Sequence, residues 1–164
     1  MKNLCATITI TLLAAVLAGC ASTGANLPPV SSLKGDDVVL ILWHDSQFNV
    51  QLRDALSSHA VSRGLKVVSD EEYHAGRYKA TDYAAVVILA KHEARGSMTI
   101  VDAFVEKYGK GDSIVVGISH EWDVESSSIR KNYDALTAAS KDFEQEEILN
   151  ALKTRLDGIL QKRH

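Results

Sequence analysis

The sequence predicts an α/β layered sandwich with a mostly parallel sheet of four or five strands. Three observations lead to this fold class: strands alternate with helical segments, the long strands are uninterruptedly apolar, and the C-terminal part is rich in helix formers. With 164 residues, 46% of them hydrophobic, the chain can form one domain with its own core. A net charge of −3 and a pI near 6.0 give no electrostatic reason to expect nucleic acid as a partner.

The first half of the domain reads as two strand–helix units and a further strand. Branched apolar runs predict the strands, and apolar residues at helical spacing before a glycine predict the helix. In order, we expect a strand at 37–43, a helix at 48–61 that Gly64 ends, a strand at 65–69, a helical turn within 70–79 and a buried strand at 83–90.

Residues 97–108 fit two structures. Ile100, Val101, Phe104 and Val105 recur at helical spacing, and Gly109 follows as a stop, so we favour a helix. The same residues are rich in β-formers, and a turn sequence follows at 108–112. The alternative is therefore a hairpin over 97–119 in a mixed sheet.

The C-terminal part is predicted to be a strand followed by helices. Residues 113–119 form the strand, and the chain reads as helical from Ile129 to the end, with a break near Ser140. Asp142 and Gln145 suit a capping box at the start of the last helix.

The N-terminal twenty residues read as an export signal. A lysine precedes an apolar run from Leu4 to Leu17 that is too short for a comfortable membrane span. The run ends in Leu17-Ala18-Gly19-Cys20, which resembles the lipobox of bacterial lipoprotein precursors. The resemblance implies cleavage of 1–19, acylation of Cys20 and, because Ala21 is not aspartate, sorting to the outer membrane facing the periplasm.

Residues 20–35 are the lipidated cysteine and a flexible tether. They are small and polar and contain both prolines of the chain. Fifteen residues at about 3.5 Å each reach roughly 50 Å at most. The domain, residues 36–164, would therefore work close to the membrane, with a formal charge of −4 once Lys2 is removed.

Two family resemblances cover about residues 36–120. The order of elements, with Asp-Tyr-Ala-Ala-Val-Val-Ile-Leu-Ala at 82–90, is similar to flavodoxin-like folds. If 97–119 is a hairpin, the chain instead resembles small lipoproteins with the fold of curli-secretion and TolB N-terminal-type domains. That second resemblance implies assembly or secretion partners.

The motifs of several enzyme classes are missing from the chain. A flavodoxin binds its flavin phosphate in a Thr/Ser/Gly loop after the first strand, whereas residues 43–49 read Trp-His-Asp-Ser-Gln-Phe-Asn. FMN binding is therefore not carried over. The chain also contains no Gly-x-Gly-x-x-Gly, Walker or Gly-x-Ser-x-Gly sequence, and cleavage and acylation leave no free thiol.

One constellation suits either fold. Three apolar strands are each followed by a histidine and an acid, in the pairs His44-Asp45, His92-Glu93 and His120-Glu121. Parallel strands place their carboxyl ends at one edge of a sheet, where ligands bind in open α/β proteins. His74, four residues after Asp70, could lie near the same edge. Imidazoles and carboxylates there could bind a divalent metal such as zinc, serve as a general base or sense pH. The alternative without a functional role is a polar strand end at which Asp45 caps the following helix.

The sequence alone supports three functional hypotheses. The first is a non-enzymatic, lipid-anchored module that binds an envelope protein or associates with itself, with Trp122 as a candidate partner contact. The second is a metal- or small-ligand-binding domain that uses the histidine–acid pairs. The third is a flavodoxin-like redox protein. The sequence names no catalytic residue, leaves enzymatic activity open and favours a protein without it.

Overall fold

The computed structural model describes residues 31–92, 98–109, 113–120, 135–139 and 142–163. Its strands are β1 (Gly35–Trp43), β2 (Lys66–Glu71), β3 (Tyr83–His92), β4 (Ile114–His120) and β5 (Ala135–Ala139). Its helices are α2 (Gln47–Ser62), α3 (Thr99–Tyr108) and α5 (Asp142–Gln161), with 3-10 helices η1 (Glu72–Arg77) and η2 (Ala80–Asp82). No helix in this described part is both long and apolar enough to cross a membrane.

The five strands form one parallel sheet in the order β2-β1-β3-β4-β5. This confirms the predicted α/β class, and the strand order is that of flavodoxin-like folds. Because all strands run in the same direction, their N-terminal ends share one edge of the sheet, the amino edge. Their C-terminal ends share the opposite edge, the carboxyl edge.

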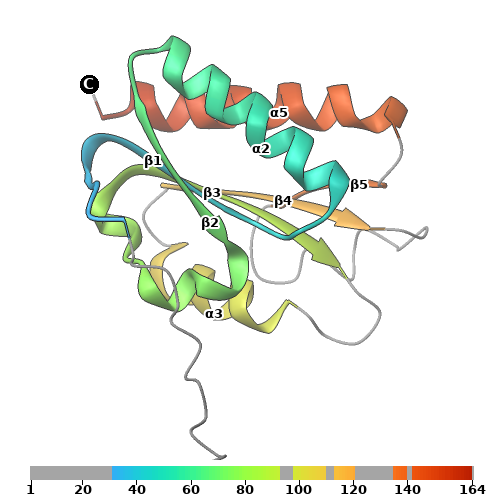
Figure 1. Cartoon of the computed structure of the whole chain (residues 1–164), viewed down its shortest axis with the longest axis horizontal. Coiled ribbons are helices and arrows are strands. Elements are labelled where there is room, and N and C mark those ends of the chain that lie inside the picture. Colours follow the sequence, from blue (N-terminus) through green and yellow to red (C-terminus); the bar gives the residue numbers. More distant parts are fainter. Residues whose placement is uncertain (1–30, 93–97, 110–112, 121–134, 140–141, 164) are drawn as a thin grey trace, which may run out of the picture. The chain divides into compact units, whose positions relative to one another are not determined.

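Helices α2 and α5 cover one face of the sheet (Figure 1). The core on this face combines residues at alternating positions of β1 and β3 with the apolar stripes of the two helices. Gly117 of β4 lies beneath Leu152 of α5, and a Cβ at Gly117 would lie 3.3 Å from Leu152 Cδ2. The helix therefore approaches β4 closely, and the residues of this core are Val39, Ile41, Phe48, Leu52, Leu56, Ala60, Ala85, Val87, Leu89, Val115, Ile148, Leu152 and Leu156.

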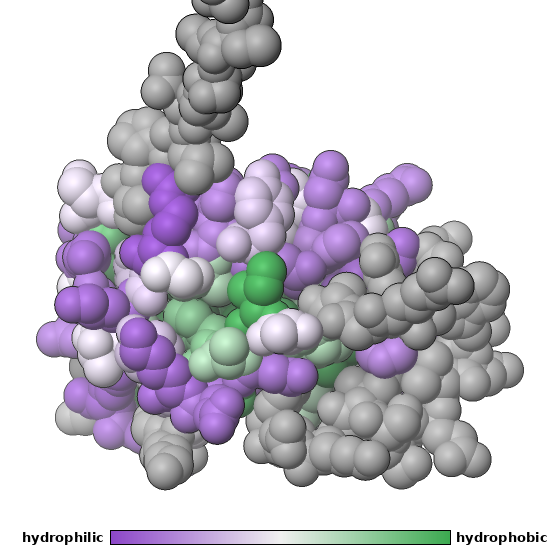
Figure 2. All heavy atoms as spheres, turned by 90° about the horizontal axis from the view of Figure 1, so that it is seen from below, coloured by the Kyte–Doolittle hydropathy of each residue, from purple (hydrophilic) through white to green (hydrophobic). Residues whose placement is uncertain are grey.

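Helix α3 and η1 lie on the other face of the sheet, at the bottom of Figure 1. The intervening strand residues, among them Leu40 and Ile88, are buried there, as are Val101 and Phe104 of α3. Figure 2 looks onto this face and shows a hydrophobic area bordered by hydrophilic side chains. Both faces of the sheet are thus apolar, which explains why β1, β3 and β4 carry continuous hydrophobic runs.

The start and end of α2 are fixed by local sequence. Ser46, with extended backbone, accepts a hydrogen bond on its Oγ from the Asn49 amide at 3.3 Å, so Ser46 rather than Asp45 is the N-cap. The helix ends at Ser62, and Gly64 follows with a φ of +80°. Its amide donates to Val61 O at 2.9 Å, so the predicted glycine stop is confirmed.

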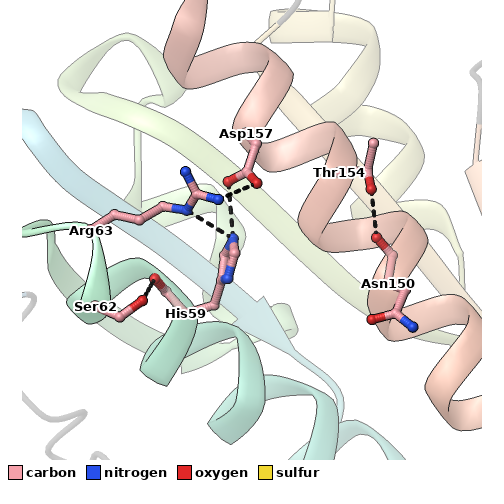
Figure 3. A network of polar contacts seen from close by, with 6 residues as sticks. All are labelled: His59, Ser62, Arg63, Asn150, Thr154 and Asp157. Carbon is pink, nitrogen blue, oxygen red and sulfur yellow. Dashed lines mark hydrogen bonds and ion pairs between the residues drawn. The ribbon is translucent and has the colours of Figure 1, made fainter.

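A polar network joins the end of α2 to α5 near the amino edge (Figure 3). Arg63 NH2 donates to Asp157 Oδ2 at 2.5 Å, and His59 Nε2 lies 2.9 Å from Asp157 Oδ1. Arg63 Nε also lies 3.1 Å from His59 Nε2. One imidazole nitrogen cannot both donate to Asp157 and accept from Arg63, so only one of the two contacts is a hydrogen bond at a time.

The hairpin alternative for 97–119 is wrong. The chain forms α3 and then β4, which pairs parallel to β3. The apolar residues Val101, Phe104 and Val105 are buried at helical spacing, so tertiary packing selects the helix over the β-propensity of the segment. Gly109 caps the helix as predicted.

The helix expected between Ile129 and the break near Ser140 is wrong at residues 135–139. Residues 135–139 form β5, the edge strand beside β4. Ala and Leu favour helices in isolation, but here they extend the sheet through backbone hydrogen bonds to β4. Residues 129–134 and Ser140 lie outside the described part, and α5 itself includes Asp142.

Candidate functional site at the carboxyl edge

The structure brings His44, His92 and His120 to the carboxyl edge of three neighbouring strands. His92 and His120 are register partners in β3 and β4, and His44 directly follows β1. Side chains alternate along a strand, so His92 shares its face with Ile88, opposite the α2–α5 core. His44 bonds to η1, which packs against α3. All three histidines therefore belong to the α3 face of this edge.

The carboxylate that orients His44 is Glu72, not its sequence neighbour Asp45. His44 Nδ1 lies 2.7 Å from Glu72 Oε1, and the two side chains are 27% and 12% exposed. Asp45 is exposed. The bond joins the end of β1 to the start of η1, 28 residues apart in the chain. A carboxylate bound to Nδ1 fixes the ring orientation and favours the tautomer with its lone pair on Nε2.

A second carboxylate–histidine pair lies at the end of β2. Asp70 Oδ1 is 2.9 Å from His74 Nδ1, and Tyr78 OH donates to Asp70 Oδ2 at 2.5 Å. His74 is 7% exposed, and its Nε2 is buried without a hydrogen-bond partner among the described residues. The predicted position of His74 at this edge is thus confirmed. Its imidazole is enclosed rather than presented to solvent.

The hydrogen bonds around Asp70 decide its ionisation. Burial acts to raise the pKa of the Asp70 carboxyl, but the bonds from Tyr78, His74 and the Glu71 amide together hold that pKa below its ordinary value of 3.8. Burial and the bond to Asp70 raise the pKa of Tyr78, so the phenol remains protonated and able to donate. Asp70 is therefore a fixed anion that anchors η1 to β2.

His92 and His120 form the most closely placed pair of the predicted histidines. Directly opposite residues of neighbouring strands lie about 5 Å apart. His120 is buried, and His92 Nδ1 is buried without a hydrogen-bond partner in the described part of the chain. Two imidazoles on adjacent strands can supply two ligands to a metal ion.

Several predicted residues lie outside the described ranges. These are Cys20, Glu93, Glu121 and Trp122. Among the residues that are described, no group of three or more His, Cys, Asp or Glu side chains is placed to hold a metal ion. His44 and His92 share an edge of the sheet without belonging to such a group.

The loop after β1 does not fit a flavin phosphate. Only His44, Asp45 and Ser46 separate β1 from α2. The amide of His44 donates to Leu89 O at 2.8 Å, and the Ser46 hydroxyl caps Asn49. Asp45 adds an exposed carboxylate that would repel an anion. The His44 amide is therefore not available to an anion, and the loop contains no glycine that would let several backbone amides converge on a phosphate.

The sequence analysis missed Glu72 and Tyr78. Glu72 contacts a residue 28 positions away, and no local pattern indicates that contact. Tyr78 continues the four-residue spacing that begins with Asp70 and His74, which was a usable signal within the predicted turn. Trp43, beside His44, is partly buried against the core with the Arg53 guanidinium 4.2 Å from its ring centroid.

Neither a family model nor a curated protein matches the chain. Several solved structures resemble the chain at low identity. A rubredoxin oxygen:oxidoreductase from Desulfovibrio gigas is 12% identical with a TM-score of 0.49, covering 79% of this chain and 36% of the other. A diflavin flavoprotein A3 from Nostoc sp. has the same identity and TM-score, covering 79% and 96%. A response regulator receiver protein from Sinorhizobium medicae is 13% identical with a TM-score of 0.47, covering 74% and 96%.

The fold class rests on the strand order of the chain itself. The described domain is a five-stranded, all-parallel α/β protein of the flavodoxin-like type, with α2 and α5 on one face. Its carboxyl edge carries histidines and carboxylates in place of a phosphate loop.

Proposed function

We propose that this chain is a lipid-anchored lipoprotein of the bacterial outer membrane whose domain binds an envelope protein without catalysing a reaction. The observation that carries the proposal is Leu17-Ala18-Gly19-Cys20 directly after a short apolar run. Acylation of Cys20 gives lasting attachment, because each buried acyl CH₂ contributes about 0.8 kcal/mol.

The start of the folded domain supports a short tether. Strand β1 begins at Gly35, fifteen positions after Cys20, and Lys34 Nζ is already 2.6 Å from Asp82 Oδ2. Fifteen extended residues span roughly 50 Å. A domain attached in this way reaches partners in or near the membrane from which it is anchored.

The carboxyl edge is the surface that we assign to partner binding. Open α/β sheets bind their ligands there, and Asp45 and the partly exposed His44 are accessible on it. Glu72 holds the His44 ring in one orientation, which lowers the entropy lost on binding.

Anchoring is tested by intact mass spectrometry of the protein made from the full chain in a bacterial host. The proposal expects loss of residues 1–19 and an added mass of acyl groups, and it expects Cys20→Ala to abolish both. An unmodified full-length product would refute the anchor.

Partner binding is tested by photo-crosslinking in cells. A photoreactive amino acid at Asp45, on the carboxyl edge, should give a discrete crosslinked band that the same group at the exposed Lys79 does not give. Mass spectrometry of the band identifies the partner, and a band of twice the chain's mass indicates self-association. Equal labelling from both positions would contradict an assigned binding edge.

The pairing of His92 with His120 favours a second candidate function, a divalent metal or small-ligand site. In this version His92 and His120 supply two ligands to zinc or a similar ion, and Glu93 and Glu121, which directly follow them in the sequence, complete the site as ligands or orienting groups. Native mass spectrometry of metal-free protein with added Zn²⁺ should show one bound ion per chain. The ion should be lost in a His92→Ala/His120→Ala variant and retained in the His59→Ala control, and identical metal content in both variants would exclude the site.

The flavodoxin-like fold also keeps a redox role compatible with the chain, and we rank this third. The short loop at 44–46 is the argument against it. A titration with FMN that leaves the flavin fluorescence unchanged would exclude this role, and stoichiometric quenching would restore it.

A further inference from the structure

The N-terminal tether joins the domain at one edge of the sheet only. The strands are all parallel, so the segment that precedes β1 joins the domain at the amino edge. The residues at this junction are fixed by ion pairs. Lys34 pairs with Asp82 at the start of β3, and Asp37 Oδ2 lies 2.8 Å from Lys66 Nζ at the start of β2. The pivot between tether and domain is therefore at the amino edge.

The end of α5 reinforces this junction. Arg163 NH1 donates to Tyr83 O at 3.0 Å and lies 3.5 Å from Asp36 Oδ1. Each of these exposed ion pairs is weak by itself, because solvent and salt screen it. Together with the backbone pairing of Gly35 to Tyr83, however, they hold residues 34–37 against the domain.

The charge of the described residues is divided between the two edges. The carboxyl edge is acidic: against Lys91 and Arg77 it carries Asp45, Asp70, Glu71, Glu72, Glu146 and Glu147. The amino edge has a basic excess, with the acids Asp36, Asp37, Asp82, Glu106 and Asp157 against the bases Lys34, Arg63, Lys66, Lys79, Lys107, Lys162 and Arg163. In a chain of net charge −3, this separation gives the domain a dipole across its sheet.

We infer that the amino edge is a membrane-facing surface that rests against anionic lipid headgroups, while the carboxyl edge points away from the bilayer. This inference depends on the proposed lipid anchor, because it describes how an anchored domain is oriented. Basic residues near an anionic surface are attracted to it and acidic ones are repelled, so the dipole and the tether favour the same orientation.

The separation of the edges makes this orientation measurable. Strand β1 has nine residues, and at about 3.3 Å each its ends lie roughly 30 Å apart. Thr81 on the amino edge and Asp45 on the carboxyl edge are both exposed, so each accepts a probe without disturbing the core.

The test measures energy transfer from a dye on the domain to acceptors in the lipid headgroups. An azide-bearing amino acid at position 81 or 45 carries the donor. The chain from Cys20 onward is coupled through the Cys20 thiol to a maleimide lipid in vesicles of phosphatidylethanolamine and phosphatidylglycerol. Chemical coupling makes the outcome independent of acylation in cells. A failed anchor and a failed orientation are therefore distinguished.

We expect transfer from position 81 to exceed that from position 45 by about twofold or more, since transfer falls steeply over the roughly 30 Å between the edges. The difference in energy transfer between the two positions should shrink in neutral phosphatidylcholine vesicles. It should also shrink at 1 M salt, where the Debye screening length is about 3 Å. Equal transfer from both positions in anionic vesicles, or greater transfer from position 45, would overturn the inference.

A charge-matched pair of variants tests the headgroup contact itself. Lys79→Gln/Lys107→Gln removes two exposed positive charges from the amino edge. Asn150→Glu/Thr154→Glu changes the net charge equally at two exposed positions in the middle of α5, between the edges. The first variant should reduce the difference between positions 81 and 45 in anionic vesicles, and the second should preserve it. An equal reduction in both would mean that net charge, rather than the amino edge, determines the orientation.

Discussion

The imidazole of His44 is held by Glu72, with 2.7 Å between Nδ1 and Oε1, across two elements that are 28 residues apart. This pair lies where β1 ends and η1 begins, and Glu72 is 12% exposed. It is the clearest link between the predicted histidine edge and the packing of the α3 face.

Replacing Glu72 with alanine should lower the free energy of unfolding by about 1–3 kcal/mol, because a charge-assisted and largely desolvated hydrogen bond is lost. Urea denaturation at neutral pH measures the change. The matched control is Asp45→Ala, which removes the exposed carboxylate beside His44 and should change stability by less than about 0.5 kcal/mol. A larger effect at Asp45 would mean that His44 is oriented by its neighbour.

The Asp70 cluster predicts an acid-sensitive component of stability. The folded-state pKa of Asp70 lies below the ordinary value of 3.8. Its contribution is therefore present above that ordinary value and is lost as the pH falls through the lower folded-state pKa. Asp70→Asn should be less stable than the parent at pH 7, and the gap should narrow as the pH is lowered from about 5 toward 2. Unfolding curves at several pH values measure the gap, and a constant gap would contradict the assignment.

Tyr78 should control that pKa. Removing its hydroxyl in Tyr78→Phe takes away the 2.5 Å bond to Asp70 Oδ2, so the pKa of Asp70 should rise toward its ordinary value. An NMR titration that follows the carboxyl carbon of Asp70 measures this pKa directly. Tyr108→Phe, in the last turn of α3 and in ring contact with Phe104, is the control and should leave the pKa of Asp70 in place.

Two glycines should respond to alanine in opposite directions. Gly64 has a φ of +80°, which costs an L-residue about 1–2 kcal/mol, so Gly64→Ala should destabilise the domain. Gly158 lies within α5, and a Cβ there meets no atom within 4 Å, so Gly158→Ala should stabilise by about 0.5–1 kcal/mol. Thermal unfolding of both variants beside the parent tests the pair. Changes of the same sign would show that one of the two backbone assignments is wrong.

Leu152 should be among the costliest positions of the core. It is fully buried, and its Cδ atoms fill the space above Gly117, so Leu152→Ala should lower the free energy of unfolding by about 2–5 kcal/mol. Val61→Ala, at a 60% exposed position of α2, should cost less than about 0.5 kcal/mol. Similar losses at both positions would contradict the close packing of α5 on β4.

Much of the fold could be predicted because each long strand carries its own signal. Strands buried on both faces are apolar throughout, so β1 and β3 can be recognised as strands from their own residues, without knowledge of their neighbours in the sheet. Strand β5 was missed for the opposite reason. Its Ala and Leu residues favour a helix locally, and only the free edge of β4 makes them a strand.

The candidate site was predictable in the same uneven way. The sequence shows where each apolar strand ends, and parallel strands end at the same edge of a sheet. The shared edge of His44, His92 and His120 could therefore be predicted. Which carboxylate meets which histidine depends on the path of η1 after β2, and a local pattern cannot encode a contact across 28 residues.

By itself, the sequence determined the α/β class, the strands that form its centre, the stop at Gly64 and the histidines at strand ends. These depend on short-range sterics, on periodicity and on burial on both faces. Only the tertiary structure decided that 99–108 is a helix, that 135–139 is a strand, that Glu72 and Asp70 orient the imidazoles and that charge is divided between the two edges. Those outcomes depend on which segments meet in space, because packing and long-range pairing outweigh the weak local preferences of each segment.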